Sequence, residues 1–353
     1  MTNKEVVAKQ EPSIETESPI GVDLDTAARA DDALRRRQAT VGRQRVLASM
    51  ALPILLVALV LVFSILRPAT FASWENARAI LLTQSVLAVL SVAVLLPLII
   101  GEFDLSVGAN LGLGAVVIPG LIVKQGLGVP VAIVLGLLVC TGVGLVNGLL
   151  VAKVKITAFI GTIAIATVIS GVVLWYSGST AIYGLPSSVS SIARASVLGV
   201  PLPVVYLLAV AGVAWYVLTL TPAGRYMYAI GGSKDAARLA GVNVERLTLL
   251  AFMATGLLCG IGAVIQTASL GVGNPSVGPP LLLPAYAAAF LGATAVKVGV
   301  FNVWGTLIGV FTLAVGITGL SLLGVPPWIE PLFNGLALIS AVTATRYLRR
   351  EAA

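Results

Sequence analysis

The stretch AILLTQSVLAVLSVAVLLPLII, residues 79–100, contains no charged side chain. A helix of about 20 residues crosses the hydrocarbon core of a bilayer, where its backbone groups can pair only within the segment. Similar charge-poor runs recur along the chain of 353 residues, of which 58% are hydrophobic and only 10% are charged. Because soluble domains carry about 25% charged residues, this composition excludes an ordinary water-soluble enzyme and predicts an all-α, polytopic membrane protein.

The amino-terminal end differs from the rest of the chain because charged residues are frequent in it. Such a segment buries too little apolar surface to fold alone. We expect a disordered, charged cytoplasmic tail at 1–45, a transmembrane domain at 46–346 with a cytoplasmic loop at 221–247, and a cytoplasmic C-terminal tail at 347–353. Charged, Pro and Gly clusters divide the transmembrane domain into about ten predicted helices: 46–66, 79–100, 105–123, 129–151, 156–176, 200–220, 248–270, 281–296, 302–324 and 328–346.

The distribution of Lys and Arg indicates the orientation, since short cytoplasmic loops collect these residues. An even number of spans places both termini in the cytoplasm. The cytoplasmic side then carries the tail residues and Lys153, Lys155, Arg225, Lys234, Arg238, Arg246, Lys297, Arg346, Arg349 and Arg350, whereas the outside carries only Arg67, Arg78, Lys124 and Arg194. The basic residues lie beside apolar runs instead of forming a cluster with aromatic residues, so no nucleic-acid partner is expected.

Ionisable and reactive side chains are scarce in the apolar runs. Histidine is absent, and Cys140 and Cys259 lie far apart, so we expect neither a metal site nor a disulfide framework. Glu102 and Asp104 lie at the predicted inner edge of the second and third spans, and Glu330 lies near the outer end of the last span, so none is deep in the membrane. The G-x-x-x-x-G-K-[S/T] phosphate loop is absent as well. We expect no catalytic residue, and any energy for pumping must come from another chain.

Small residues recur at helix-packing spacing inside the predicted spans. The pairs are Gly108 with Gly112, Gly144 with Gly148, Gly256 with Gly260, and Gly305 with Gly309. Lipid provides no hydrophobic drive between helices, so close backbone approach at such pairs favours association. We interpret the pairs as packing sites, in a bundle whose helices can also slide.

A polar segment interrupts the apolar runs at Thr221–Arg246, TPAGRYMYAIGGSKDAARLAGVNVER. Ser233 is a good N-cap, Asp235 favours the first helical turn, and Gly241 suits the end of a helix. The segment therefore predicts a short helix over 234–240 on the cytoplasmic side.

Four motifs carry a resemblance that covers roughly residues 75–346: GEFDLSVG at 101–108, NGLLVAKVKITAFIGT at 147–162, GRYMYAIGGSKDAARLAGV at 224–242 and WGTLIGV at 304–310. The sequence resembles the membrane subunits of bacterial ATP-binding-cassette (ABC) importers of the ribose, xylose and arabinose type. The loop signature is the most specific part of this resemblance. It comprises Gly224, Arg225, Ala229, Gly231, Gly232, Ala236, Ala237 and Gly241.

The resemblance implies a multi-pass permease subunit, not an enzyme, in the bacterial cytoplasmic (inner) membrane. It would translocate a monosaccharide-type solute delivered by a periplasmic or lipid-anchored binding protein. A second permease chain, identical or related, and a cytoplasmic ABC ATPase would complete the importer, with ATP-Mg in the ATPase and no cofactor in this chain. The ATPase would contact the short helix through Gly231, Gly232, Ser233, Lys234, Asp235, Ala236, Ala237, Arg238 and Gly241.

Neutral polar side chains are the expected lining of a path for sugar hydroxyl groups. The candidates are Asn110, Asn147, Thr162, Gln266 and Asn334, for each of which a hydrogen bond between helices is an equal alternative. Glu330, which follows Pro326 and Pro327, is the candidate contact for the binding protein.

The chain departs from the family pattern in two places. It reads LGATAVKVGVFNVWGTLIG at 291–309, where family members often have a glycine-rich stretch, and it has Glu102 where they usually have glycine. Glu102 is either a functional charge or an interfacial residue that extends to water. Two other functions stay open: a self-contained secondary carrier or channel, and the same architecture serving a branched-chain amino acid, a nucleoside or a furanose-like signal.

Overall fold

The computed structural model describes residues 49–197 and 199–350, without the side chains of residues 345–350. The predicted tail at 1–45 lies outside the described residues, and only the backbone of 347–350 is described from the predicted C-terminal tail. The described part is mostly helical, which confirms the predicted all-α class.

The helices follow one another with short connections. After a first helix, Ser49–Leu66, come α2 Trp74–Ile99, α3 Val107–Val123, α4 Val129–Ala152, α5 Ala158–Ser177, α6 Ser187–Arg194, α7 Leu202–Leu220, α8 Pro222–Gly232, α9 Lys234–Leu239, α10 Val244–Leu270, η1 Pro279–Leu281, α11 Leu282–Gly292, α12 Val303–Leu322 and α13 Ile329–Arg350. Two short strands, β1 Ser196–Val197 and β2 Val200–Pro201, pair antiparallel between α6 and α7.

Seven helices of the described part are long and apolar enough to cross a membrane: Ser49–Leu66, α2, α4, α5, α7, α10 and α12. Shorter apolar helices cover Val107–Val123, Pro279–Gly292 and Ile329–Ala344. These helices lie at the predicted ranges, with differences at their ends. For example, α2 begins at Trp74 instead of residue 79, because the Ser73 hydroxyl accepts a hydrogen bond from the backbone N–H of Asn76 at 3.1 Å and caps the helix there.

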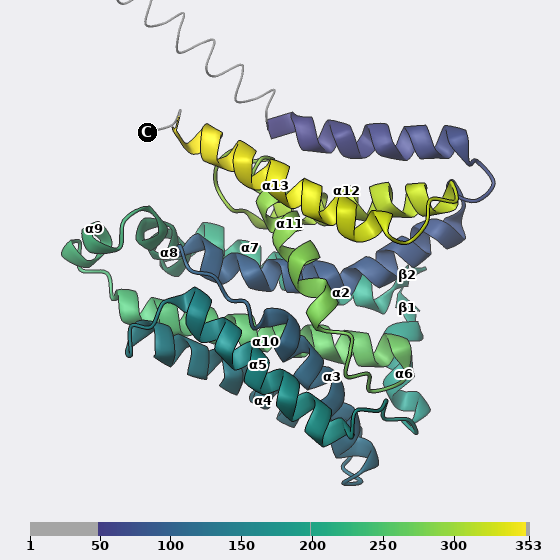
Figure 1. Cartoon of the computed structure of the whole chain (residues 1–353), viewed down its shortest axis with the longest axis horizontal. Helices are drawn as coiled ribbons and strands as arrows, with labels where there is room; N and C mark the ends of the chain where they lie inside the picture. Colours follow the sequence, from purple (N-terminus) through teal and green to yellow (C-terminus); the bar gives the residue numbers. More distant parts are fainter. Residues whose placement is uncertain (1–48, 198, 351–353) are drawn as a thin grey trace, which may run out of the picture. The chain divides into compact units, whose positions relative to one another are not determined.

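Helix α2 is the centre of the bundle, and every residue from Ser85 to Ile99 is buried. Figure 1 shows α4, α5 and α10 on one side of α2 and α12 and α13 on the other. Helix α10 packs along α4, and α11 packs against α2, α12 and α13. Large apolar side chains such as Leu138, Ile160 and Val213 are exposed on the outer faces of α4, α5 and α7, as expected for faces that contact lipid.

The predicted glycine pairs are contact points between helices. A Cβ atom on Gly144 of α4 would overlap the carbonyl oxygen of Phe252 on α10, and one on Gly309 of α12 would lie 2.5 Å from the carbonyl oxygen of Ala288 on α11. A Cβ atom placed on any of the other six glycines would also lie within 4 Å of a neighbouring segment: Gly108, Gly112, Gly148, Gly256, Gly260 and Gly305. The interpretation of these pairs as packing sites is confirmed.

Candidate functional site

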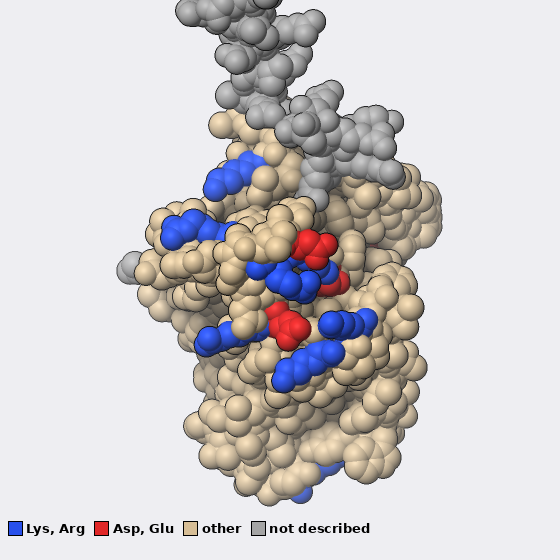
Figure 2. All heavy atoms as spheres, turned by 90° about the vertical axis from the view of Figure 1, so that its left-hand side faces the viewer, with Lys and Arg blue, Asp and Glu red and all other residues tan. Residues whose placement is uncertain are grey.

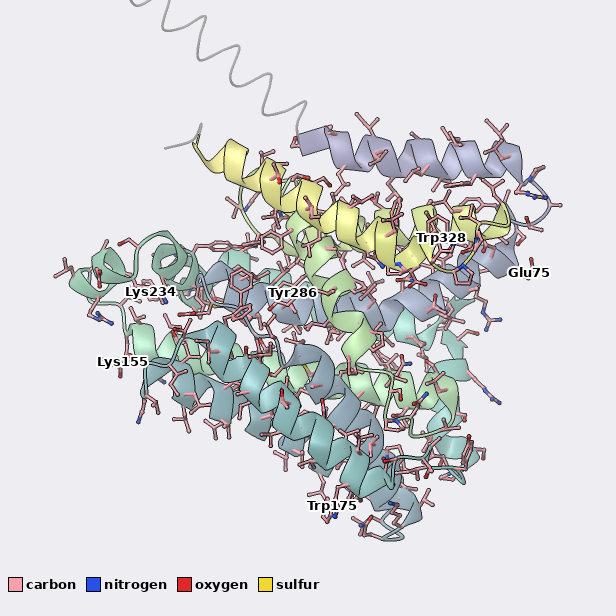
Figure 3. The ribbon with its side chains drawn as sticks, in the orientation of Figure 1. Glu75, Lys155, Trp175, Lys234, Tyr286 and Trp328 are labelled. Atoms are coloured by element: carbon pink, nitrogen blue, oxygen red, sulfur yellow. The ribbon has the colours of Figure 1, made fainter. Side chains whose placement is uncertain are left out.

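Charged side chains gather at the end of the bundle that carries α8 and α9, which we call the α9 end (Figure 2). Its residues include Lys153, Lys155, Arg225, Lys234, Arg238 and Arg246, with Glu102, Asp235 and Glu245 between them. Figure 3 shows Lys155 and Lys234 at this end and Glu75 and Trp328 at the opposite end. The two ends of the bundle therefore present different surfaces to any partner.

The short helix of the polar segment forms as predicted, over Lys234–Leu239. The Ser233 hydroxyl accepts a hydrogen bond from the backbone N–H of Ala236 at 3.2 Å, and Asp235 pairs with Arg238 at 3.5 Å. Gly241 follows the helix with φ +82°, a conformation that glycine adopts without strain. The capping residues thus fix both ends of α9.

Not all residues of α9 are available to a partner. Lys234, Asp235, Ala236 and Arg238 are exposed, but Ala237 is only 4% exposed and belongs to the main hydrophobic core. Ala237 therefore attaches α9 to the body of the protein instead of offering a contact surface.

Leu239, which is not among the predicted site residues, is 91% exposed at the end of α9. An isolated leucine in a short helix of charged and small residues was the signal that would have identified it. Leu239 is thus the one large apolar side chain that α9 leaves exposed.

Gly231 and Gly232 occupy the junction between α8 and α9, and both are exposed. A Cβ atom on Gly231 would overlap the carbonyl oxygen of Ile99 at the end of α2, whereas one on Gly232 would have open space around it. Gly231 thus permits a close approach between α8 and α2.

The linker between α2 and α3 contains a buried polar cluster around Asp104. The carboxylate accepts hydrogen bonds from the Ser106 hydroxyl at 2.6 Å, the Ser106 backbone N–H at 3.0 Å and the Asn147 amide at 3.4 Å. Burial raises the pKa of the Asp104 carboxyl, although the hydrogen bonds from Ser106 and Asn147 oppose this shift. The Tyr286 hydroxyl completes the cluster, since it donates to the Asp104 carbonyl oxygen and accepts from the Asp104 backbone N–H, both at 2.9 Å.

Three of the predicted path residues hold helices together. The Asn147 amide donates to Ser106 at 2.7 Å and joins α4 to the start of α3. The Asn110 amide donates to the carbonyl oxygen of Cys140 on α4 at 3.0 Å. The Thr162 hydroxyl accepts from the Leu105 backbone N–H at 2.9 Å. All three side chains are buried.

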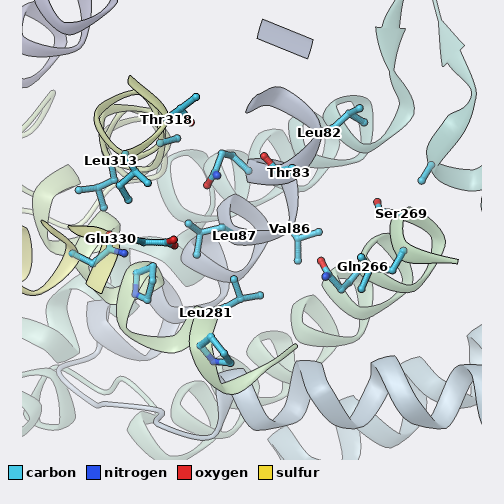
Figure 4. Close-up of a pocket in the computed structure, with 18 of the residues that line it drawn as sticks. Leu82, Thr83, Val86, Leu87, Gln266, Ser269, Leu281, Leu313, Thr318 and Glu330 are labelled. Atoms are coloured by element: carbon cyan, nitrogen blue, oxygen red, sulfur yellow. The ribbon is translucent and has the colours of Figure 1, made fainter. Parts of the chain in front are cut away.

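The other two path candidates, Gln266 and Asn334, line a cavity of about 840 Å³ together with Glu330 (Figure 4). Residues of α2, α6, α10, η1, α11, α12 and α13 form its walls. The polar ones are Arg78, Thr83, Gln84, Arg194, Gln266, Ser269, Thr318, Glu330 and Asn334. Arg78 and Arg194 were not among the predicted site residues. Amide and hydroxyl groups with a few charges suit a small polar solute.

Apolar helices, a partly polar cavity that opens to the surface and a short exposed helix at a charged end are features expected of a membrane transport protein. The family model described as "Branched-chain amino acid transport system / permease component" matches residues 76–342, and the chain belongs to this family.

Curated relatives in this family share about one third of their residues with the chain. The ribose import permease protein of Haemophilus influenzae is 33% identical over 84% of this chain and 92% of the relative. That of Bacillus subtilis is 35% identical over 82% of this chain and 89% of the relative. The D-allose transport system permease protein of Escherichia coli is 29% identical over 84% and 91%, respectively. No solved structure matches the chain.

Family membership establishes the general role of the chain. It is a permease component of a transport system in the cytoplasmic membrane, and its relatives are transport subunits instead of enzymes.

Proposed function

We propose that the chain is the membrane-spanning permease subunit of an ABC importer for a monosaccharide-type solute. The relatives named as ribose and D-allose permeases support this solute class. The family description names branched-chain amino acids, so the same architecture with another solute is the second candidate. The observation that carries the importer role is α9, an exposed helix at the charged end of a permease from this family.

We further propose ten spans, formed by the seven long helices and the three shorter apolar ones. A short helix can cross where the neighbouring helices satisfy its ends. An even number places both termini on one side, and the richness of the α9 end in Lys and Arg supports a cytoplasmic position for that end. Binding of ATP-Mg and its hydrolysis then belong to a partner ATPase, and this chain needs no cofactor.

The ATPase partner would dock on the exposed surface of α9. That surface consists of Gly231, Gly232, Ser233, Lys234, Asp235, Ala236, Arg238, Leu239 and Gly241. A short helix that inserts an apolar side chain into a groove is a common mode of protein recognition. Leu239 is the proposed anchor, with Asp235 and Arg238 at the rim of the contact.

The cavity lined by Gln266 and Asn334 is the proposed part of the solute path on the side opposite the ATPase. Amide groups there can exchange hydrogen bonds with sugar hydroxyl groups, beside the charged groups of Arg78, Arg194 and Glu330. Glu330 lines the same cavity and is exposed, so it is the proposed contact for an extracytoplasmic binding protein. A second permease chain would complete the path.

Co-purification tests the proposal. The tagged chain is purified from membranes with its co-expressed ATPase and binding protein, and ATP hydrolysis is measured with ribose, D-allose, leucine and a nucleoside. We expect a sugar to stimulate hydrolysis. Leu239→Arg is expected to abolish ATPase co-purification, whereas Val197→Arg, which alters an exposed apolar residue at the opposite end, should leave it intact.

The result that would contradict the proposal is also specific. If no ATPase associates and the purified chain alone carries solute across liposomes, the chain is a secondary carrier. Stimulation by leucine instead of the sugars would keep the importer role and replace the solute class.

A further inference from the structure

The cavity ends within the bundle before it reaches the α9 end. On α2 the lining includes Leu87 but no later residue, and on α11 it includes Pro284 but no later residue. Beyond these points α2 is buried through Ile99, and Ala285–Ala289 of α11 are also buried. Packed side chains therefore close the cavity on the side of α9.

Four aromatic side chains lie on this closed side, and we call them the aromatic cluster: Phe103, Tyr286, Phe290 and Phe301. The ring of Phe103 stacks on Tyr286 and Phe290, with centroid distances of 5.9 and 6.4 Å. Phe301 meets Phe290 edge-on at 5.2 Å. Phe103 is 41% exposed, whereas Tyr286 and Phe301 are buried. The exposed ring of Phe103 thus covers the buried part of the cluster.

Two polar contacts tie this cluster to the α8–α9 segment. Glu102, the neighbour of Phe103 in the chain, forms an ion pair with Lys234, the first residue of α9. The Tyr228 hydroxyl on α8 donates a hydrogen bond to the Phe301 carbonyl oxygen at 2.7 Å. A displacement of the α8–α9 segment would therefore act on both Phe103 and Phe301.

The linker between α2 and α3, which contains Glu102 and Phe103, also transmits such a displacement to α11. The Tyr286 hydroxyl binds both backbone groups of Asp104, the residue after Phe103. The side chain of Glu102 is 15% exposed and that of Lys234 is 45% exposed, so their pair is partly accessible to water. Ion pairs of this kind are weak and can break and re-form during a transport cycle.

We propose that Phe103 closes the solute path by stacking on Tyr286 and Phe290, and that the Glu102–Lys234 pair couples this gate to α9. Glu102 is thereby a positioning residue, since it acts through the neighbouring ring. An apolar constriction blocks polar solutes because they cannot keep their hydration in it. The inference rests on the proposed importer function, in which a partner ATPase moves α9.

Thiol labelling tests the gate without reference to any solute. Thr83→Cys places a reactive thiol in the cavity, and the native Cys140 and Cys259 are fully buried. In sealed vesicles that hold the complex without nucleotide, a membrane-impermeant reagent added on the α9 side should not reach residue 83. Adding Phe103→Ala should raise the labelling rate at least tenfold, whereas Phe71→Ala, at an aromatic pair outside the cluster, should not. Equal labelling with and without Phe103→Ala would overturn the gate.

Uptake tests the coupling. With radiolabelled D-ribose, Glu102→Gln and Glu102→Lys should each lower the uptake per ATP hydrolysed at least fivefold while the ATPase still co-purifies. The exchanged pair Glu102→Lys with Lys234→Glu should restore the ratio. Unchanged ratios in the single variants, or an exchanged pair that restores nothing, would overturn the coupling. Loss of the importer function itself is distinguishable, since the unsubstituted chain would then bind no ATPase.

Discussion

Asp104 shows how much a single residue depends on its surroundings in this protein. Its position between two apolar runs placed it at the edge of the membrane, but the structure buries its side chain among Ser106, Asn147 and Tyr286. These partners come from segments as far apart as α4 and α11, so the sequence pattern near Asp104 did not indicate them. A buried carboxylate is tolerated when hydrogen bonds replace its water.

Two substitutions separate the charge of Asp104 from its hydrogen bonds. Asp104→Ala leaves the hydroxyl and the backbone N–H of Ser106 without their acceptor and should lower the free energy of unfolding by about 2–3 kcal/mol, close to the cost of buried unpaired polar groups. Asp104→Asn keeps an acceptor and should stay within about 1 kcal/mol of the wild type. The apparent melting temperature in detergent measures both.

The pH dependence of these variants follows from the raised pKa of Asp104. A carboxyl group whose pKa is raised by folding stabilises the folded state only while it is protonated, so wild-type stability should fall as the pH rises through the raised pKa. Asp104→Asn should lack that decline. If the stability of the wild type and of Asp104→Asn depended on pH in the same way, the raised pKa of Asp104 would not control the decline.

Helices α4 and α10 show, at the scale of elements, how glycine sets the distance between segments. Gly144 and Gly256 face each other across this contact, with the Cα of Gly144 3.1 Å from a Cβ placed on Gly256. In a membrane such proximity replaces the hydrophobic effect as the source of helix association, because dispersion contacts increase as the backbones approach.

Two alanine substitutions on α4 test this packing. Gly144→Ala would overlap the carbonyl oxygen of Phe252, so we expect α4 and α10 to separate at a cost of about 1–3 kcal/mol. Gly142→Ala meets nothing within 4 Å and should be neutral or stabilise by up to about 1 kcal/mol through helix propensity. Thermal unfolding in detergent compares them, and equal melting temperatures would contradict the close contact.

The arrangement of charges at the two ends is a property of the whole molecule. The α9 end carries Lys153, Lys155, Arg225, Lys234, Arg238 and Arg246, whereas the opposite end carries Arg67, Arg78, Lys124 and Arg194 among the described residues. Two of these residues, Arg78 and Arg194, line the cavity together with Glu330. The proposed ATPase side and the proposed solute side therefore lie at different ends of the same bundle.

Cysteine mapping in sealed membrane vesicles tests this orientation. Lys155→Cys and Lys234→Cys should react with an impermeant thiol reagent only from the cytoplasmic side, and Glu75→Cys and Trp328→Cys only from the other side. The wild-type chain is the control because Cys140 and Cys259 are fully buried. Tags at both chain termini should be accessible from the same side as Lys155→Cys. Termini on different sides would contradict an even number of spans.

The sequence by itself determined the apolar helices, the short α9 and the glycine contacts, whereas α6 and α8 were not among the predicted helices. Each depends on neighbours in the chain: hydropathy over about 20 residues, a serine cap, or a spacing of four. Neighbours in the chain do not explain the segment at 293–302, which lies where family members often have a glycine-rich stretch. In the structure the Asn302 amide donates to the carbonyl oxygens of Ala295 and Val300 at 3.1 and 3.0 Å, and its oxygen caps α12 through Gly305.

Only the tertiary structure decided which side chains meet. It turned Ala237 inward and Leu239 outward, placed Gln266 and Asn334 on one cavity, and used Asn110, Asn147 and Thr162 between helices. It also paired Glu102 with Lys234, 132 positions later in the chain. The physical reason is that these contacts depend on the rotation and tilt of helices packed from distant segments. In spans that are apolar on nearly every face, hydropathy does not specify that rotation.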